Sequence, residues 1–428
     1  MLNRTSLALA CAALVAAVAT SAQAQYKSAI DGKGSYSATT PTASSSGFEA
    51  AGVPSSGKYE PAALRVGDGN LAVTPTVGVS FGHNDNMSRT NVNRRSSGFI
   101  VLTPSIYASS QLGSNKYSLG YQGEFTTYQS STRDNTKNHE VAASGEHDLD
   151  TRFALNWRAS FLDRFDPAGS TDRAAGASGE PDHWKASNWA LVARYGAKSA
   201  PGRIFLEVGE YDKEYKNNRA STAASDYKST NSSLRFVGRM TGKTNFTAEY
   251  RLSKFNYALD TSGLDNYERR ALVGLEWEAT AATSGSFKVG NLRKNYSSAR
   301  RDFSGATYEG GLRWAPLTYS RVDLSVGRSA SDPTGSTAGY LLSTYGSAKW
   351  THDWRSYFST RVTLGQNKAK YVGDVRKDTT YDYGIGVDYV LTRNARLSAD
   401  LQRSTRNSNS DSLDYDLNLV STKLELAF

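Results

Sequence analysis

Arginine side chains stand between apolar neighbours at several places in this sequence. Arg158 follows a tryptophan and precedes an alanine, and Arg235 and Arg251 are each flanked by a leucine and an aromatic residue. A period of two places such arginines on one face of a β-strand and the apolar side chains on the other. Guanidinium groups bind carboxylates through paired hydrogen bonds and stack on flat faces. Such a polar face therefore suits an acidic or sugar-like polymer.

We predict that these polar faces line an aqueous channel that carries both signs of charge. The predicted lining residues are Arg158, Arg235, Arg239, Arg251, Arg313, Arg321, Arg361, Arg396, Glu124, Glu249, Glu276, Asp323, Asp382 and Asp400. For any one of them a structural role is the stronger hypothesis, because arginine and acidic residues on neighbouring strands pair and stiffen a wall.

Other chemistry has little support in the sequence. The histidines, which are His83, His139, His147, His183 and His352, stand at expected loops, strand ends or isolated strand positions. No nucleophile, base and orienting group can be placed together from their spacing. The chain has a single cysteine, Cys11, and we expect it to be removed with a leader peptide, which leaves no thiolate ligand or disulfide. We predict no catalytic residue, no cofactor and no metal site.

The elements that position the charged residues are expected to be strands of about ten residues, which suffice to cross a bilayer at the usual tilt. Residues 117–125, 246–252 and 271–277 show the alternation clearly. Short turns are expected at sites such as Asp150, Pro316-Leu317 and Asp353, and longer polar loops, such as residues 84–97 and 166–183, lie between them. After the leader, no run of 18 or more apolar residues indicates a transmembrane helix.

Counting these runs predicts an all-β protein, a transmembrane antiparallel up-and-down barrel of about 18 strands, or about 16–18. Short turns then face the periplasm and longer loops face the outside. The spacing of the hairpins, roughly 40 residues, also resembles that of a propeller blade. The charged residues on one face of nearly every strand favour the barrel, because both sheet faces of a propeller blade are buried.

Both ends of the chain carry targeting features. Val420, Leu424, Leu426 and Phe428 alternate with polar residues, which is typical of the last strand of an outer-membrane barrel and predicts recognition by the barrel-assembly machinery. Residues 1–24 predict a signal peptide, with Ala22 and Ala24 at the cleavage site. We predict a flexible periplasmic segment over residues 25–70 and the barrel over residues 71–428, placed in the outer membrane of a Gram-negative cell.

Two local patterns resemble a known family. A Val-Thr-Pro motif at residues 73–75 opens the first strand, which ends in Gly-His-Asn-Asp-Asn at residues 82–86. A Leu-Thr-Pro motif recurs at residues 102–104, before a tyrosine-rich strand at residues 119–128. These features are similar to those of the β-barrel porin type 2 family. The resemblance implies a role in exporting a secreted polysaccharide across the outer membrane with a periplasmic export partner, and it supplies no catalytic residue.

The sequence thus favours a non-enzymatic conduit for exopolysaccharide. A general or substrate-selective diffusion porin for small solutes is the second hypothesis, and a surface adhesin or structural barrel is the third. The expected partners are outer-membrane lipid, the barrel-assembly machinery, a polysaccharide and a periplasmic export protein, with no nucleic acid. The formal net charge of +9 is compatible with an acidic partner and requires none.

Overall fold

The computed structural model describes residues 26–27, 35–36, 59, 61–67, 70–171, 180–280, 282–298, 302–333 and 338–428. The predicted signal peptide, with Ala22 and Ala24, lies outside the described residues, as does most of the predicted segment 25–70. Within that segment, β1 (Tyr26–Lys27) and β2 (Ser35–Tyr36) form a small antiparallel ladder.

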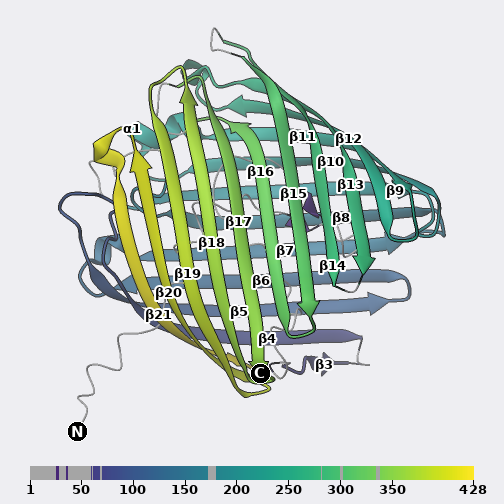
Figure 1. Cartoon of the computed structure of the whole chain (residues 1–428), viewed down its shortest axis with the longest axis horizontal. Coiled ribbons are helices and arrows are strands. Elements are labelled where there is room, and N and C mark those ends of the chain that lie inside the picture. Colours follow the sequence, from purple (N-terminus) through teal and green to yellow (C-terminus); the bar gives the residue numbers. More distant parts are fainter. Residues whose placement is uncertain are drawn as a thin grey trace.

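The rest of the described chain forms one closed barrel of 18 antiparallel strands, β4 to β21, each hydrogen-bonded to its neighbours in the chain (Figure 1). The strands are β4 (Leu71–Asn84), β5 (Ser97–Leu112), β6 (Asn115–Tyr128), β7 (Thr136–Asp148), β8 (Phe153–Asp166), β9 (Asp182–Tyr195), β10 (Gly202–Tyr215), β11 (Tyr227–Arg239), β12 (Thr244–Tyr257), β13 (Asn266–Thr280), β14 (Thr283–Tyr296), β15 (Phe303–Leu317), β16 (Ser320–Ser331), β17 (Tyr340–Arg355), β18 (Phe358–Val372), β19 (Lys377–Thr392), β20 (Ala395–Ser408) and β21 (Tyr415–Ala427). The predicted up-and-down barrel is confirmed, and the propeller is excluded.

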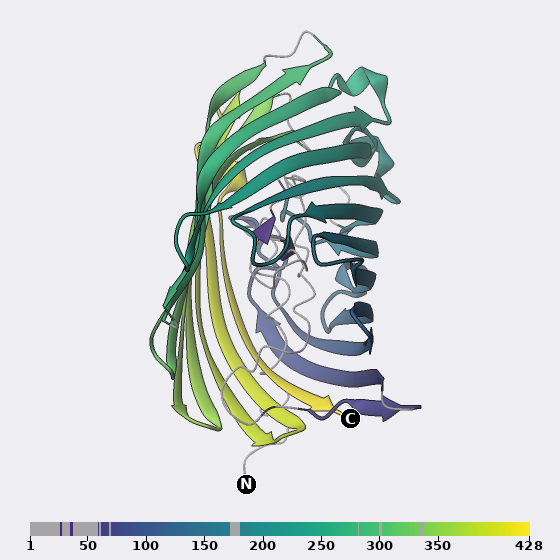
Figure 2. The same cartoon turned by 90° about the vertical axis from the view of Figure 1, so that its right-hand side faces the viewer.

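The strands are strongly tilted. In Figure 1 the front strands, β15 to β21, run steeply, whereas the rear strands, such as β5 and β6, run across the view. Figure 2 shows the same two walls from the side, curving toward each other at their edges. Such a crossing of front and back walls follows from the tilt that closes a sheet into a barrel.

The barrel closes between its first and last strands. β21 pairs with β4 from Leu419 opposite Asn84 to Ala427 opposite Thr76, and the backbone N–H of Phe428 donates to the carbonyl of Pro75 at 3.1 Å. The start of β4 extends beyond β21, and there the short strand β3 (Leu64–Val66) pairs with it. The end of the chain therefore completes the wall.

The two ends of the barrel differ in the length of the connections between strands. At the turn end, where β4 begins and β21 ends, tight turns join pairs such as β5–β6 and β19–β20. At the loop end, longer connections contain the short helices η2 (Thr132–Asp134), α1 (Arg219–Thr222), η3 (Ala223–Ser225), η4 (Asp260–Ser262) and η5 (Asp411–Leu413). The short turns and the longer loops thus lie at opposite ends of the barrel, as the sequence predicts.

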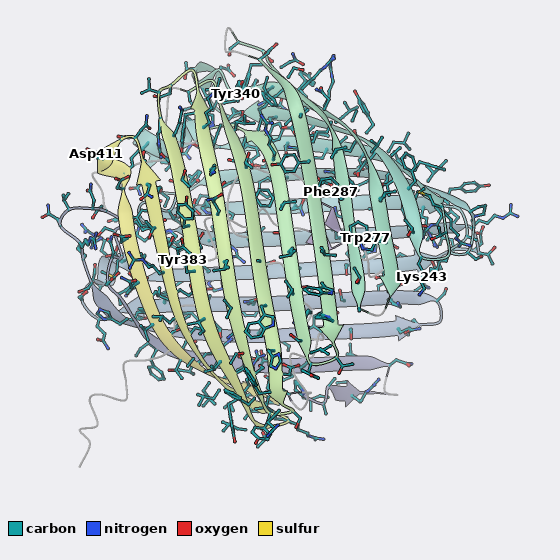
Figure 3. The ribbon with its side chains drawn as sticks, viewed as in Figure 1. Lys243, Trp277, Phe287, Tyr340, Tyr383 and Asp411 are labelled. Atoms are coloured by element: carbon teal, nitrogen blue, oxygen red, sulfur yellow. The ribbon has the colours of Figure 1, made fainter. Side chains whose placement is uncertain are left out.

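The two faces of the wall differ in chemistry because successive side chains point to opposite sides. On the outer face, large apolar side chains are exposed in the isolated chain, among them Leu234 at 54%, Val273 at 49% and Ile385 at 53%. Figure 3 shows the side chains of Phe287 and Tyr383 on this surface. Among the described residues, no helix has the length and apolarity to cross a membrane.

Candidate functional site: the inner face of the barrel

A network of charged side chains covers the inner face from β11 to β15. We call it the β11–β15 cluster, and its members are Arg235, Glu249, Arg251, Glu276, Lys288 and Glu309. Arg251 binds Glu249 at 2.6 Å and Glu309 at 2.7 Å, and Arg235 binds Glu276 at 3.0 Å. Lys288 Nζ lies 2.9 Å from Glu249, 3.6 Å from Glu309 and 4.0 Å from Glu276. Three cations thus match three carboxylates, and the cluster is neutral.

The neutrality of the cluster matters because its side chains are buried. The side chains of Glu249 and Lys288 are 1% and 3% exposed, and the other members are at most 16% exposed. A glycine leaves room for Lys288, because a Cβ on Gly274, its partner in the next strand, would lie 2.8 Å from Lys288 Cγ. Charged groups removed from water require opposite charges and hydrogen bonds to offset their desolvation. Within the cluster each buried charge therefore has a counter-charge that offsets its desolvation.

A second network, the β18–β20 cluster, consists of Arg361, Asp388, Ser398 and Asp400. Arg361 binds Asp388 at 2.6 Å and Asp400 at 3.0 Å, and the Ser398 hydroxyl donates to Asp388 at 2.6 Å. Gly386 stands beside this cluster, and a Cβ there would lie 2.1 Å from Asp400 Oδ1. The arginine again pairs along the wall, with strands one and two positions away, and not across the lumen.

The other predicted lining residues with recorded contacts also have partners on nearby strands. The pairs are Arg158 with Glu207, Arg313 with Asp323 at 2.6 Å, Arg321 with Asp323 at 3.1 Å, Arg396 with Glu425 at 2.9 Å, Asn138 donating to Glu124 at 3.1 Å, and Ser404 donating to Asp382 at 2.7 Å. Arg239 is exposed at the turn end of β11. Pairing within the wall supports the structural hypothesis for these residues.

A third network, near the loop end, was not predicted. Asp332, in the β16–β17 loop, accepts hydrogen bonds from Tyr257 at 2.8 Å and Tyr296 at 2.7 Å, and it pairs with Lys294 at 2.9 Å. Glu268 pairs with a neighbouring arginine of β13 and lies 3.8 Å from Lys294. The alternation of charged residues in β13 indicates part of this network, but no local pattern shows that a loop aspartate turns inward.

Buried aromatic side chains pack around this third network. The cluster includes Trp184, Tyr211, Tyr215, Tyr227, Phe255, Tyr257, Tyr296, Phe303 and Tyr340. Their exposed fractions are 8% or less, so the rings pack on one another and leave little open face. The loop end of this side of the barrel is therefore held by a packed core.

Residues 167–171, at the start of the β8–β9 loop, contact segments that lie far from β8 along the wall. Arg406 Nη1, on β20, donates to the carbonyls of Gly169 and Thr171, each at 3.4 Å. Gly169 has φ +67, and a Cβ there would lie 2.8 Å from the backbone oxygen of Ser88 in the β4–β5 loop. β8 and β20 are separated by five strands along the wall. Residues 167–171 therefore lie over part of the mouth.

Tyr59 lies against the inner face near the turn end. The Arg396 guanidinium stacks over its ring at 4.8 Å. Burial, followed by the nearby Glu425 carboxylate, raises the pKa of Tyr59 above its ordinary value. Among the described residues, no group of three or more His, Cys, Asp or Glu side chains could hold a metal ion.

The closed wall, its apolar outer face and its polar inner face define a porin-like outer-membrane β-barrel. The chain belongs to the family described as Putative beta-barrel porin 2, which matches residues 57–428. The predicted family is confirmed. A comparison with curated proteins finds no match.

Solved structures of low identity are similar to the chain. The outer membrane protein OpdK from Pseudomonas aeruginosa is 14% identical, with a TM-score of 0.46, over 83% of this chain and 99% of that one. A BenF-like porin from Pseudomonas fluorescens Pf-5 is 9% identical, with a TM-score of 0.48, over 84% and 99%. A bacterial polysaccharide outer membrane secretin is 10% identical, with a TM-score of 0.36, over 83% and 98%.

Proposed function

We propose that this barrel is a non-enzymatic conduit through which an exopolysaccharide leaves the cell. Two features support the proposal: the family resemblance, which implies polysaccharide export, and the polar inner face, whose charges are compensated. The charge pairing of the β11–β15 and β18–β20 clusters is the observation that carries most weight. The polymer is moved by its synthesis and by periplasmic machinery.

The pairing of arginines also bears on the substrate. An arginine held by two carboxylates, as Arg251 and Arg361 are, presents little net charge to a passing molecule. An acidic polymer gains little from such a wall, because each contact with an arginine competes with a pair already formed. A neutral or weakly charged glycan fits better, since it needs hydrogen-bonding groups and no fixed counter-charge.

Deletion of the gene tests this proposal. Secreted polysaccharide should fall while the polymer, or its lipid-linked precursor, continues to be made inside the cell. Complementation with the full chain should restore secretion. Unchanged secretion in the deletion strain would refute an export role.

A diffusion porin for small solutes is the second candidate, and the description of the family as porins favours it. Planar-bilayer recording separates the two functions. A large, steady conductance that polysaccharide does not block supports the diffusion porin. A conductance that is small or closed, and that changes when the polymer is added, supports the conduit.

The same proposal includes the route to the membrane. Residues 1–24 act as a signal peptide cleaved after Ala24, and the C-terminal strand, through Val420, Leu424, Leu426 and Phe428, is read by the barrel-assembly machinery. Mass spectrometry of the mature protein tests the cleavage site, and an intact Met1 in the membrane fraction would contradict it.

A further inference from the structure

Two pairs of like charges face each other on the outer surface near the loop end. Arg269 on β13 is directly opposite Arg293 on β14, and Lys370 on β18 is directly opposite Lys377 on β19. All four side chains are exposed. Their sequence neighbours, such as Arg270 and Lys294, are buried on the inner face. We call these two pairs the rim pairs.

Like charges placed directly opposite each other destabilise a sheet. On the inner face of the same strands each buried cation has a carboxylate: Arg270 binds Glu268 at 2.6 Å, and Lys294 binds Asp332 at 2.9 Å. The rim pairs form no ion pair with any residue in the described part of the chain. The cations of the rim pairs repel each other on the outer face, whereas the buried cations of the inner face are paired with carboxylates. This difference points to an anion outside the protein as the partner of the rim pairs.

The position of Arg269 and Arg293 relative to the apolar side chains of the outer face indicates where that anion lies. Below Arg269 and Arg293, toward the middle of the barrel, Val273 and Val289 are 49% and 44% exposed and belong to the apolar band of the outer face. Four residues of strand separate each arginine from its valine, which is about 13 Å along the strand. Lys254 of β12 is opposite Tyr267, two residues nearer the loop end than Arg269, with its ammonium 5.6 Å from the Tyr267 ring. The arginines thus lie between this apolar band and the loop end, which is where the headgroups of a membrane are expected to begin.

We propose that the rim pairs bind phosphate groups of lipids in the outer leaflet of the membrane. A guanidinium binds phosphate through two parallel hydrogen bonds, and a lysine supplies a point charge. Phosphorylated glycolipid is the occupant that fits, because the rim pairs are on the outer face and each consists of two cations. This inference does not depend on what the barrel transports.

Lipid binding by matched variants tests the proposal. The rim variants are Arg269→Gln with Arg293→Gln, and Lys370→Gln with Lys377→Gln. The control is Lys243→Gln with Arg393→Gln, which removes two charges at the turn end, where Figure 3 shows Lys243. Each folded protein, checked by its heat-modifiable gel band, is titrated in detergent with diphosphoryl lipid A and with the same lipid after removal of its phosphates.

The unmodified protein and the control should bind diphosphoryl lipid A equally. In each rim variant the affinity of the substituted pair should fall about 30-fold, as expected for the loss of two cations at an anionic membrane surface, and the other rim pair should bind as before. The dephosphorylated lipid should bind all proteins weakly. Equal binding of the two lipids, or unchanged binding by both rim variants, would overturn the proposal.

Discussion

Replacing Arg251 by methionine removes the central cation of the β11–β15 cluster. Arg251 donates four hydrogen bonds to two carboxylates, at 2.6 and 2.9 Å to Glu249 and at 2.7 and 2.9 Å to Glu309. Without it, three glutamates share Arg235 and Lys288, so the buried cluster carries a net charge of −1.

The expected cost is large. Removing one partner of a buried ion pair costs about 3–5 kcal/mol, because the other charge stays buried without compensation. Arg313 provides the matched control, since it also pairs with a carboxylate but its side chain is 50% exposed. Arg313→Met should cost about 0–1 kcal/mol, as solvent screens that pair. Adding Glu309→Gln to Arg251→Met restores a neutral cluster and should recover much of the loss.

Urea unfolding of the protein refolded into lipid vesicles, followed by tryptophan fluorescence, measures these differences. The order of stability should be unmodified protein, Arg313→Met, the double variant, and Arg251→Met. If Arg313→Met were as costly as Arg251→Met, burial would not govern these pairs. If the double variant were less stable than Arg251→Met, charge compensation would not be the reason for the cluster.

Three further predictions concern the mouth, the outer face and the seam. Arg406→Met should release the β8–β9 loop and raise single-channel conductance in planar bilayers; an unchanged conductance would mean that the loop does not narrow the mouth. Val273→Arg, near the middle of a lipid-facing strand, should cost about 2–4 kcal/mol in vesicle unfolding, and a cost near zero would place this side chain in water. Val79→Cys with Leu424→Cys, which are paired between β4 and β21, should form an intramolecular disulfide, and a disulfide only between molecules would contradict a closed wall.

The alternation of side chains could be predicted from the sequence because it is local. In β12, Phe246, Tyr250 and Leu252 are exposed on the outer face, and Glu249 and Arg251 point inward. The period of two fixes this sorting once a strand forms, since neighbouring residues point to opposite faces. The closure of β21 on β4 was likewise indicated by the apolar alternation that ends at Phe428.

The partners of the inner charges could not be predicted. Arg251 reaches Glu309 three strands away, and this contact depends on the curvature and stagger of the closed barrel, which no single strand encodes. The inward turn of Asp332 and the contact of Arg406 with Gly169 depend in the same way on loop paths.

Two expected turns were displaced. Pro316 and Asp353 lie within β15 and β17, and the strands turn instead at residues 318–319 and 356–357. The ladder between β15 and β16 shifts its register after Trp314, so Pro316 lies in an irregular part of the strand, where a missing N–H is tolerated. Pro316 therefore indicates the irregular end of β15, and the turn itself follows at residues 318–319.

Spin-label accessibility along β13 tests the central claim most directly, which is that side chains alternate between lipid and the interior around a closed wall. The single cysteine of the chain, Cys11, falls within the expected signal peptide, so the mature protein takes one label at a time at residues 271, 272, 273, 275, 276 and 277; Gly274 is left unchanged because a side chain there would meet the backbone of β14. Labels at 271, 273, 275 and 277 should collide with lipid-dissolved oxygen, and labels at 272 and 276 should be shielded from it. Equal oxygen accessibility at all six positions would contradict the membrane barrel.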